Sequence, residues 1–87
     1  GGQNDYEDFV FTCTVKSKLN HETKILNIHL NTTKFTETCN SENRNHENYF
    51  FVLPGTNIVL KSKQWISPSQ GSLFIYNYYA FQNEIIS

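Results

Sequence analysis

The alternation of side chains from Gly71 to Phe81 constrains the fold more than any other part of the sequence. The segment reads Gly-Ser-Leu-Phe-Ile-Tyr-Asn-Tyr-Tyr-Ala-Phe, and large apolar residues occupy both alternating sets. Aromatic and β-branched residues suit a pleated surface, whereas an amphipathic helix would need a separate apolar stripe at three-to-four spacing. We therefore predict a strand through Phe81, with both of its faces at least partly covered.

The first half of the chain repeats this pattern twice. Phe9 to Lys16 alternates and is predicted to be a half-buried strand with Cys13 on its core side. Lys24 to Asn31 alternates again, and Leu26, Ile28 and Leu30 are predicted to face inward. The polar residues 17–23 between these runs predict a hairpin with a loop of about six residues.

The middle of the chain alternates less clearly between apolar and polar residues. Thr32 to Thr38 has one large apolar residue, Phe35, and is predicted to form a short edge strand. Cys39 to Asn48 has no apolar residue after the cysteine, so a solvated loop is expected there.

Two further strands are expected before the last one. Tyr49 to Leu53 is a candidate central strand, ended by the turn dipeptide Pro54-Gly55. Asn57 to Lys63 follows, with Ile58 and Leu60 inward. Trp65 and Ile66 are expected to cap the core, and residues 67–71 form a turn.

These elements predict an all-β fold. Short strands joined by hairpins favour a small antiparallel β-sandwich of immunoglobulin-like or related topology, and a five-stranded OB-type barrel is the alternative. We expect a single β-domain over residues 9–82, between a flexible acidic N-terminus (1–8) and a frayed C-terminus (83–87).

Size and charge limit the possible functions. A chain of 87 residues has a thin core, and its aromatic fraction of 15% must supply much of the burial. The formal net charge is −1, which argues against a basic field that would attract nucleic acid or anionic lipid. The longest apolar run, Tyr49 to Leu53, is too short to cross a bilayer.

The two cysteines, Cys13 and Cys39, predict a disulfide. It would close a loop of about 27 residues and stabilise the fold by about 3.5 kcal/mol in the chain-entropy model. Two buried thiols in a cytosolic protein are the alternative. The disulfide favours a secreted, periplasmic or cell-surface location.

No set of residues has the spacing of a catalytic or metal site. His21, His29 and His46 form no metal-ligand pair. A ribonuclease-like group of Glu47, Arg44 and a histidine would lie in a poorly positioned loop. We therefore expect a protein that is not an enzyme and that uses no metal or cofactor.

The predicted last strand carries the best indication of a binding surface. Phe74, Tyr76 and Tyr78 would lie on one face, with Lys61 and Lys63 on the preceding strand. Such tyrosines anchor a protein partner, or they stack on sugars or bases.

The favoured function is protein binding, as a component of a surface or secretion assembly or as a secreted factor. The contact would use this face or the edge at Lys34 to Thr38. A β-barrel that binds carbohydrate or single-stranded nucleic acid is the alternative. Asn31-Thr32-Thr33 also fits an N-glycosylation acceptor, although an asparagine-rich chain contains such triplets by chance.

Overall fold

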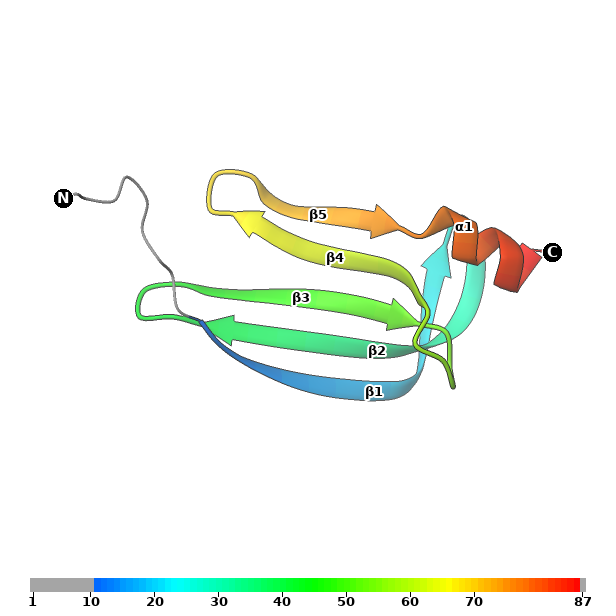
Figure 1. Cartoon of the computed structure of the whole chain (residues 1–87), viewed down its shortest axis with the longest axis horizontal. Coiled ribbons are helices and arrows are strands. Elements are labelled where there is room, and N and C mark those ends of the chain that lie inside the picture. The colour runs from blue at the N-terminus through cyan, green and yellow to red at the C-terminus, as the bar shows by residue number, and fades with distance from the viewer. Residues whose placement is uncertain (1–10, 87) are drawn as a thin grey trace.

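The protein forms one antiparallel sheet in which every strand pairs with its neighbours in sequence. The structure is a computed structural model and describes residues 11–86. The strand order is β1-β2-β3-β4-β5 (Figure 1). The strands are β1 (Thr12–Ile25), β2 (Ile28–Asn40), β3 (Asn45–Val52), β4 (Val59–Ser67) and β5 (Gly71–Tyr76).

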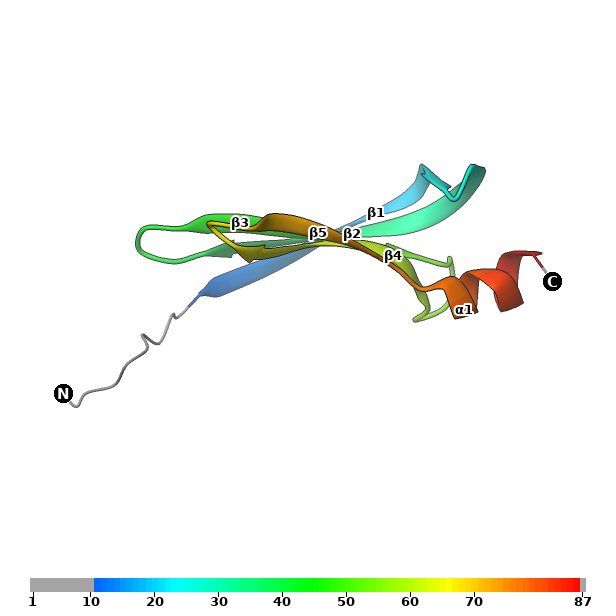
Figure 2. The same ribbon diagram turned by 90° about the horizontal axis from the view of Figure 1, so that it is seen from above.

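The predicted all-β, antiparallel fold class is confirmed. The sheet is not closed, and its first and last strands are both edges. Seen from above, the described strands form a twisted layer that bends at one end (Figure 2). The predicted N-terminal segment 1–8 and residues 9 and 10 lie outside the described residues.

The first hairpin has longer strands and a shorter turn than predicted. β1 continues through the polar residues 17–23, so the expected six-residue loop is wrong. The strand pairing shifts register between Lys18 and His21, where Asn20 adopts a φ of 55°. The turn is made by Leu26 and Asn27, with φ values of 50° and 70°. Two successive positive φ angles suit the right-handed twist of a two-residue hairpin, but leucine gives no sequence signal for such a turn.

β2 is an interior strand, which corrects two predictions. Residues 32–38 belong to β2 and pair with β1 on one side and β3 on the other, so they form no edge. The expected solvated loop at 39–48 is also wrong, because β2 runs to Asn40 and β3 begins at Asn45. Only a short turn remains, in which the Ser41 backbone N–H donates to the Arg44 carbonyl at 2.7 Å. Cross-strand pairing thus orders a stretch that has little apolar content of its own.

The remaining turns follow the sequence signals. Pro54-Gly55 reverses the chain between β3 and β4, with Gly55 at a φ of 76° and the Thr56 N–H donating to the Leu53 carbonyl at 3.1 Å. Residues 67–71 form the turn between β4 and β5, where Gly71 has a φ of 74°. β3 is central, as predicted.

The last strand ends five residues earlier than predicted. β5 stops at Tyr76, and α1 (Tyr78–Phe81) and the π-helical turn η1 (Gln82–Ile86) follow. Asn77 starts α1, since its side-chain oxygen accepts a hydrogen bond from the Ala80 N–H at 3.1 Å, as asparagine does at helix N-caps. The strand prediction was wrong here because the two-residue period continued past this cap. The predicted frayed end is helical over residues 83–86.

The small core lies at the end of the molecule where the hairpin tip, the start of β4 and α1 meet (Figure 1). Ile25, Leu60 and Phe81 are each 1% exposed. Leu30, Leu53, Ile58, Ala80 and Ile85 pack around them. The inward placement of Leu60 and Ile58 was predicted correctly. That of Leu26 and Ile28 was wrong, because both are exposed and Ile25 takes the buried position.

Candidate functional site

One face of the sheet gathers lysines and aromatic rings in two rows that cross all five strands. Side chains of directly paired residues project from the same face of a sheet. The first row is Lys16, Thr36, Tyr49, Lys63 and Phe74, and the second is Lys18, Lys34, Phe51, Lys61 and Tyr76. We call this surface the lysine face. It contains five of the six lysines of the chain.

The lysines and rings of this face are in direct contact. The Lys61 Nζ lies 5.4 Å from the centroid of the Phe51 ring, 5.1 Å from that of Phe74 and 5.7 Å from that of Tyr76. The Lys34 Nζ lies 4.7 Å from the Tyr49 centroid. Cation–π attraction acts at such distances, so each ring helps to fix the position of an ammonium group.

Four of the five predicted binding residues come together on the lysine face. Lys61 and Lys63 lie directly opposite Tyr76 and Phe74. Tyr78 does not join them, because it lies in α1 beyond the end of β5. That part of the prediction was wrong.

The sequence interpretation missed the lysines and rings that the first three strands add to this face. Lys34, Tyr49 and Phe51 join it through the register of β2, β3 and β4. The alternation within each segment could have indicated which residues share a face of that strand. The pairing register between distant segments could not be read from the sequence.

Glu47 places a carboxylate beside these rows. It accepts hydrogen bonds from the Tyr49 hydroxyl and from the Thr38 hydroxyl, the latter at 3.2 Å. The bond from Tyr49, then that from Thr38, holds the pKa of the Glu47 carboxyl below its usual value. The same bond raises the pKa of the Tyr49 phenol. The carboxylate is therefore already engaged by two donors within the sheet.

His21 borders the lysine face from the far half of β1. Its ring centroid lies 5.8 Å from that of Phe51. Desolvation, followed by the charges of Lys34 and Lys18, lowers the pKa of its imidazole. Desolvation is the larger cause, and the two nearby ammonium groups add to it.

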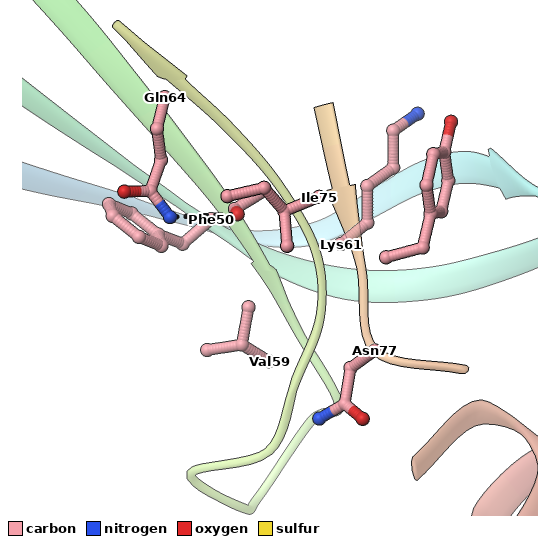
Figure 3. A pocket seen from close by; sticks show the side chains of 8 residues that line it. Phe50, Val59, Lys61, Gln64, Ile75 and Asn77 are labelled. Atoms are coloured by element: carbon pink, nitrogen blue, oxygen red, sulfur yellow. Dashed lines mark hydrogen bonds between the residues drawn. The ribbon is translucent and has the colours of Figure 1, made fainter. Parts of the chain in front are cut away.

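The opposite face, which we call the apolar face, carries apolar and polar side chains but none of the five lysines of the lysine face. Phe35, Phe50, Ser62 and Ile75 form one row across it. Val15 and Leu73, which also lie on it, are 61% and 53% exposed. A depression of about 460 Å³ lies around Phe50, Ser62 and Ile75, and Lys61 and Tyr76 of the lysine face also line it. Figure 3 shows Phe50 and Gln64 on one side of β4 and Lys61 on the other, as expected for alternating side chains.

Asn48 joins three strands on the apolar face. Its amide N–H₂ donates to the Glu37 carboxylate at 2.9 Å, and its oxygen accepts from the Trp65 backbone N–H at 2.7 Å. Glu37 lies on β2, Asn48 on β3 and Trp65 on β4. This polar link holds the strands at the end of the sheet that lies far from the core.

The predicted disulfide is present at the same end. Cys13 and Cys39 are directly paired on β1 and β2, with 4.0 Å between their Cα atoms. Both project from the same face, but Cys39 is buried whereas Cys13 is exposed, so the predicted core-side placement of Cys13 was wrong. Glu37 lies beside both sulfurs. Because the disulfide leaves no thiolate, these three residues do not offer a metal the ligands it would need.

The histidines lie apart from one another. His46 stacks on Trp65 with 4.3 Å between ring centroids, and Phe11 contacts its edge at 4.9 Å. His29 is exposed and pairs with Lys24 in the hairpin arm. Since His46 and Glu47 are successive strand residues, they project from opposite faces. The ribonuclease-like group considered above therefore does not converge on one site.

The β5 edge exposes four large apolar side chains in succession. Leu73, Phe74, Ile75 and Tyr76 are 53%, 51%, 43% and 44% exposed. β4 pairs with one side of β5, and no strand among residues 11–86 pairs with the other. An open, apolar edge of this kind is a template for pairing with another chain.

The chain matches a known protein family over most of its length. The model of the family described as "Group 4 capsule polysaccharide lipoprotein gfcB, YjbF" matches residues 2–76. The chain belongs to this family. No curated protein and no solved structure matches it significantly.

The family is one of capsule lipoproteins, which agrees with the predicted extracytoplasmic location and with the disulfide. Within residues 11–86, no helix has the length and apolar character needed to span a membrane. The side chain of Asn31, the predicted glycosylation acceptor, donates to Asn20 at 3.3 Å.

Proposed function

We propose that the protein is a non-catalytic component of a capsule polysaccharide assembly at the cell surface or in the periplasm, and that it binds a partner protein through the β5 edge. The observation that carries this proposal is the run of four exposed apolar residues from Leu73 to Tyr76 on an unpaired strand. Main-chain hydrogen bonds to an added strand would give affinity, and side chains on alternate positions would give selectivity.

The two edge strands differ in a way that favours β5. The predicted contact edge at Lys34 to Thr38 is not available, since β2 is paired on both sides. β1 is an edge, but its side chains in the straight half include two exposed lysines, Lys16 and Lys18. Lysines on an edge oppose strand addition. β5 has no charged residue between Gly71 and Tyr76.

Photo-cross-linking in the producing cell tests this proposal. A photoreactive amino acid at Leu73 should cross-link to a protein of the capsule apparatus, identified by mass spectrometry. Ile75→Lys in the same chain should reduce that product at least tenfold, because a lysine at the edge resists strand pairing.

Val15→Lys is the matched control. Val15 lies on the same face but on the other edge strand and is 61% exposed, so the cross-link should persist. Equal loss in both variants would assign the contact to the whole apolar face rather than to the edge. No cross-linked protein at Leu73 would overturn the proposal.

A further inference from the structure

The lysine face concentrates charge that the net charge of the chain conceals. The chain carries a formal net charge of −1, yet five lysines lie in two rows on one face. The carboxylate beside them, Glu47, is engaged by Tyr49 and Thr38. Lys34 and Lys18 also act on His21, where they lower the pKa of the imidazole after desolvation, the larger cause. The register of the sheet, rather than composition, produces this basic surface.

Lysines and aromatic rings lie on adjacent strands of this face. β1, β2 and β4 contribute lysines, whereas β3 and β5 contribute rings. Neighbouring strands lie about 4.8 Å apart, and alternate residues of one strand lie about 6.7 Å apart. The face is thus a grid of lysines and aromatic rings. Its spacing lets successive units of one extended ligand contact neighbouring side chains.

The outer part of this grid is open to solvent. Phe74 and Tyr76 are 51% and 44% exposed, whereas Phe51 is only 9% exposed. The Lys61 Nζ lies 5.1 Å from the Phe74 centroid and 5.7 Å from the Tyr76 centroid, and the Lys63 Nζ lies 5.5 Å from the Phe74 centroid. An aromatic face carries partial negative charge and attracts the C–H groups of a stacked sugar ring. The adjacent ammonium groups can bind acidic substituents of the same sugar chain.

We propose that the lysine face binds an acidic polysaccharide, with its carboxylates or phosphates on the lysines and its sugar rings stacked on Phe74 and Tyr76. The charge complementarity of five lysines selects an anionic ligand. Several weak contacts along one polymer add up to useful affinity. The inference rests on the proposed extracytoplasmic setting in a capsule assembly, but not on strand addition at β5.

Other occupants fit the same face less well. A second copy of the chain, set lysine face to lysine face, would bring like charges together. An anionic membrane would satisfy the lysines, but this face presents its rings among ammonium groups and not as a protruding apolar wedge. A polymer of acidic sugars uses both the rings and the charges.

Binding to a matched pair of polysaccharides tests the inference. The full chain is titrated with polygalacturonate and with uncharged galactan, and amide chemical shifts are recorded for each. We expect polygalacturonate to shift residues of the lysine face and to bind at least tenfold more tightly than galactan. Raising the salt concentration should weaken this binding, because exposed charges are screened.

Substitutions of lysines on this face test whether these side chains bind polygalacturonate. Lys34→Gln, Lys61→Gln and Lys63→Gln combined should weaken polygalacturonate binding at least about tenfold, since each removes one ionic contact. Lys24→Gln is the control, because Lys24 lies in the hairpin arm outside both rows. If the triple variant does not fold, Lys16→Gln combined with Lys18→Gln serves instead, as both side chains are exposed.

Three results would overturn the inference. One is equal affinity of wild type and a folded lysine variant for polygalacturonate. Another is binding to vesicles containing phosphatidylglycerol without binding to polygalacturonate, which would assign the face to a membrane. The third is binding of galactan as tight as that of polygalacturonate. None of these results bears on the Leu73 cross-link, which concerns the opposite face and the strand edge.

Discussion

The two faces of the sheet are built from the same five strands but carry different side chains. The lysine face combines five lysines with four aromatic rings. The apolar face carries the disulfide, the Asn48 link and Leu60, which alternates with Lys61 and enters the core. The disulfide, the Asn48 hydrogen bonds and Leu60 on the apolar side hold the sheet together, whereas the lysine face carries most of the positive charge.

Stability on the apolar side is itself uneven along the sheet. At one end, Ile25, Leu60 and Phe81 exclude water. At the other, a covalent bond and the Asn48 hydrogen bonds replace a hydrophobic core. A layer with exposed side chains on both faces buries little apolar area. The disulfide and the Asn48 hydrogen bonds therefore provide a large share of its stability.

The largest expected effect is at the core. Phe81→Ala should lower the free energy of unfolding by about 3–5 kcal/mol, because it leaves a cavity between the hairpin tip and β4. Thermal or denaturant unfolding measures the loss. Tyr79→Ala, in the same short helix but 80% exposed, should change stability by less than about 0.5 kcal/mol. Similar losses in both variants would contradict the core described above.

The disulfide is expected to have the next largest effect. Cys13→Ser combined with Cys39→Ser should lower the free energy of unfolding by about 3.5 kcal/mol, since the unfolded chain loses a long constraint. A reductant should destabilise the wild type similarly and leave the double variant unchanged. A loss below about 1 kcal/mol would mean that strand pairing alone holds this end of the sheet.

The smallest expected effect lies on the lysine face and depends on pH. Since the pKa of Glu47 is lowered in the folded state, its stabilising effect is present above its unfolded pKa and is lost as the pH falls through its folded value. Since the pKa of Tyr49 is raised, its effect is present below its unfolded pKa and is lost as the pH rises through its folded value. The pair should therefore be intact from about pH 5 to about pH 10.

Carboxyl NMR titration checks this pair directly. Tyr49→Phe should raise the pKa of Glu47, because the first of its two hydrogen-bond donors is removed. Thr38→Val is the matched variant and should raise it less, as the Thr38 bond makes the smaller contribution. An unchanged pKa of Glu47 in Tyr49→Phe would contradict the role of this hydrogen bond.

The sequence predicted strands and turns well where the local residue pattern determines them. The apolar run over residues 49–53 and the turn at Pro54-Gly55 predicted a central strand and a reversal, and both are observed. The disulfide was also predictable from its two cysteines. The hairpin turn at Leu26-Asn27 was not, because leucine, unlike asparagine, is not typical of a positive φ angle.

By itself, the sequence determined that the chain forms antiparallel strands and that its charges nearly balance, since both follow from the residues present and their two-residue period. Only the tertiary structure decided where those charges lie. Lys18, Lys34 and Lys61 are far apart in the chain, and they share one row because the strands pair in one particular register. A shift of one residue would move a strand's lysines to the opposite face.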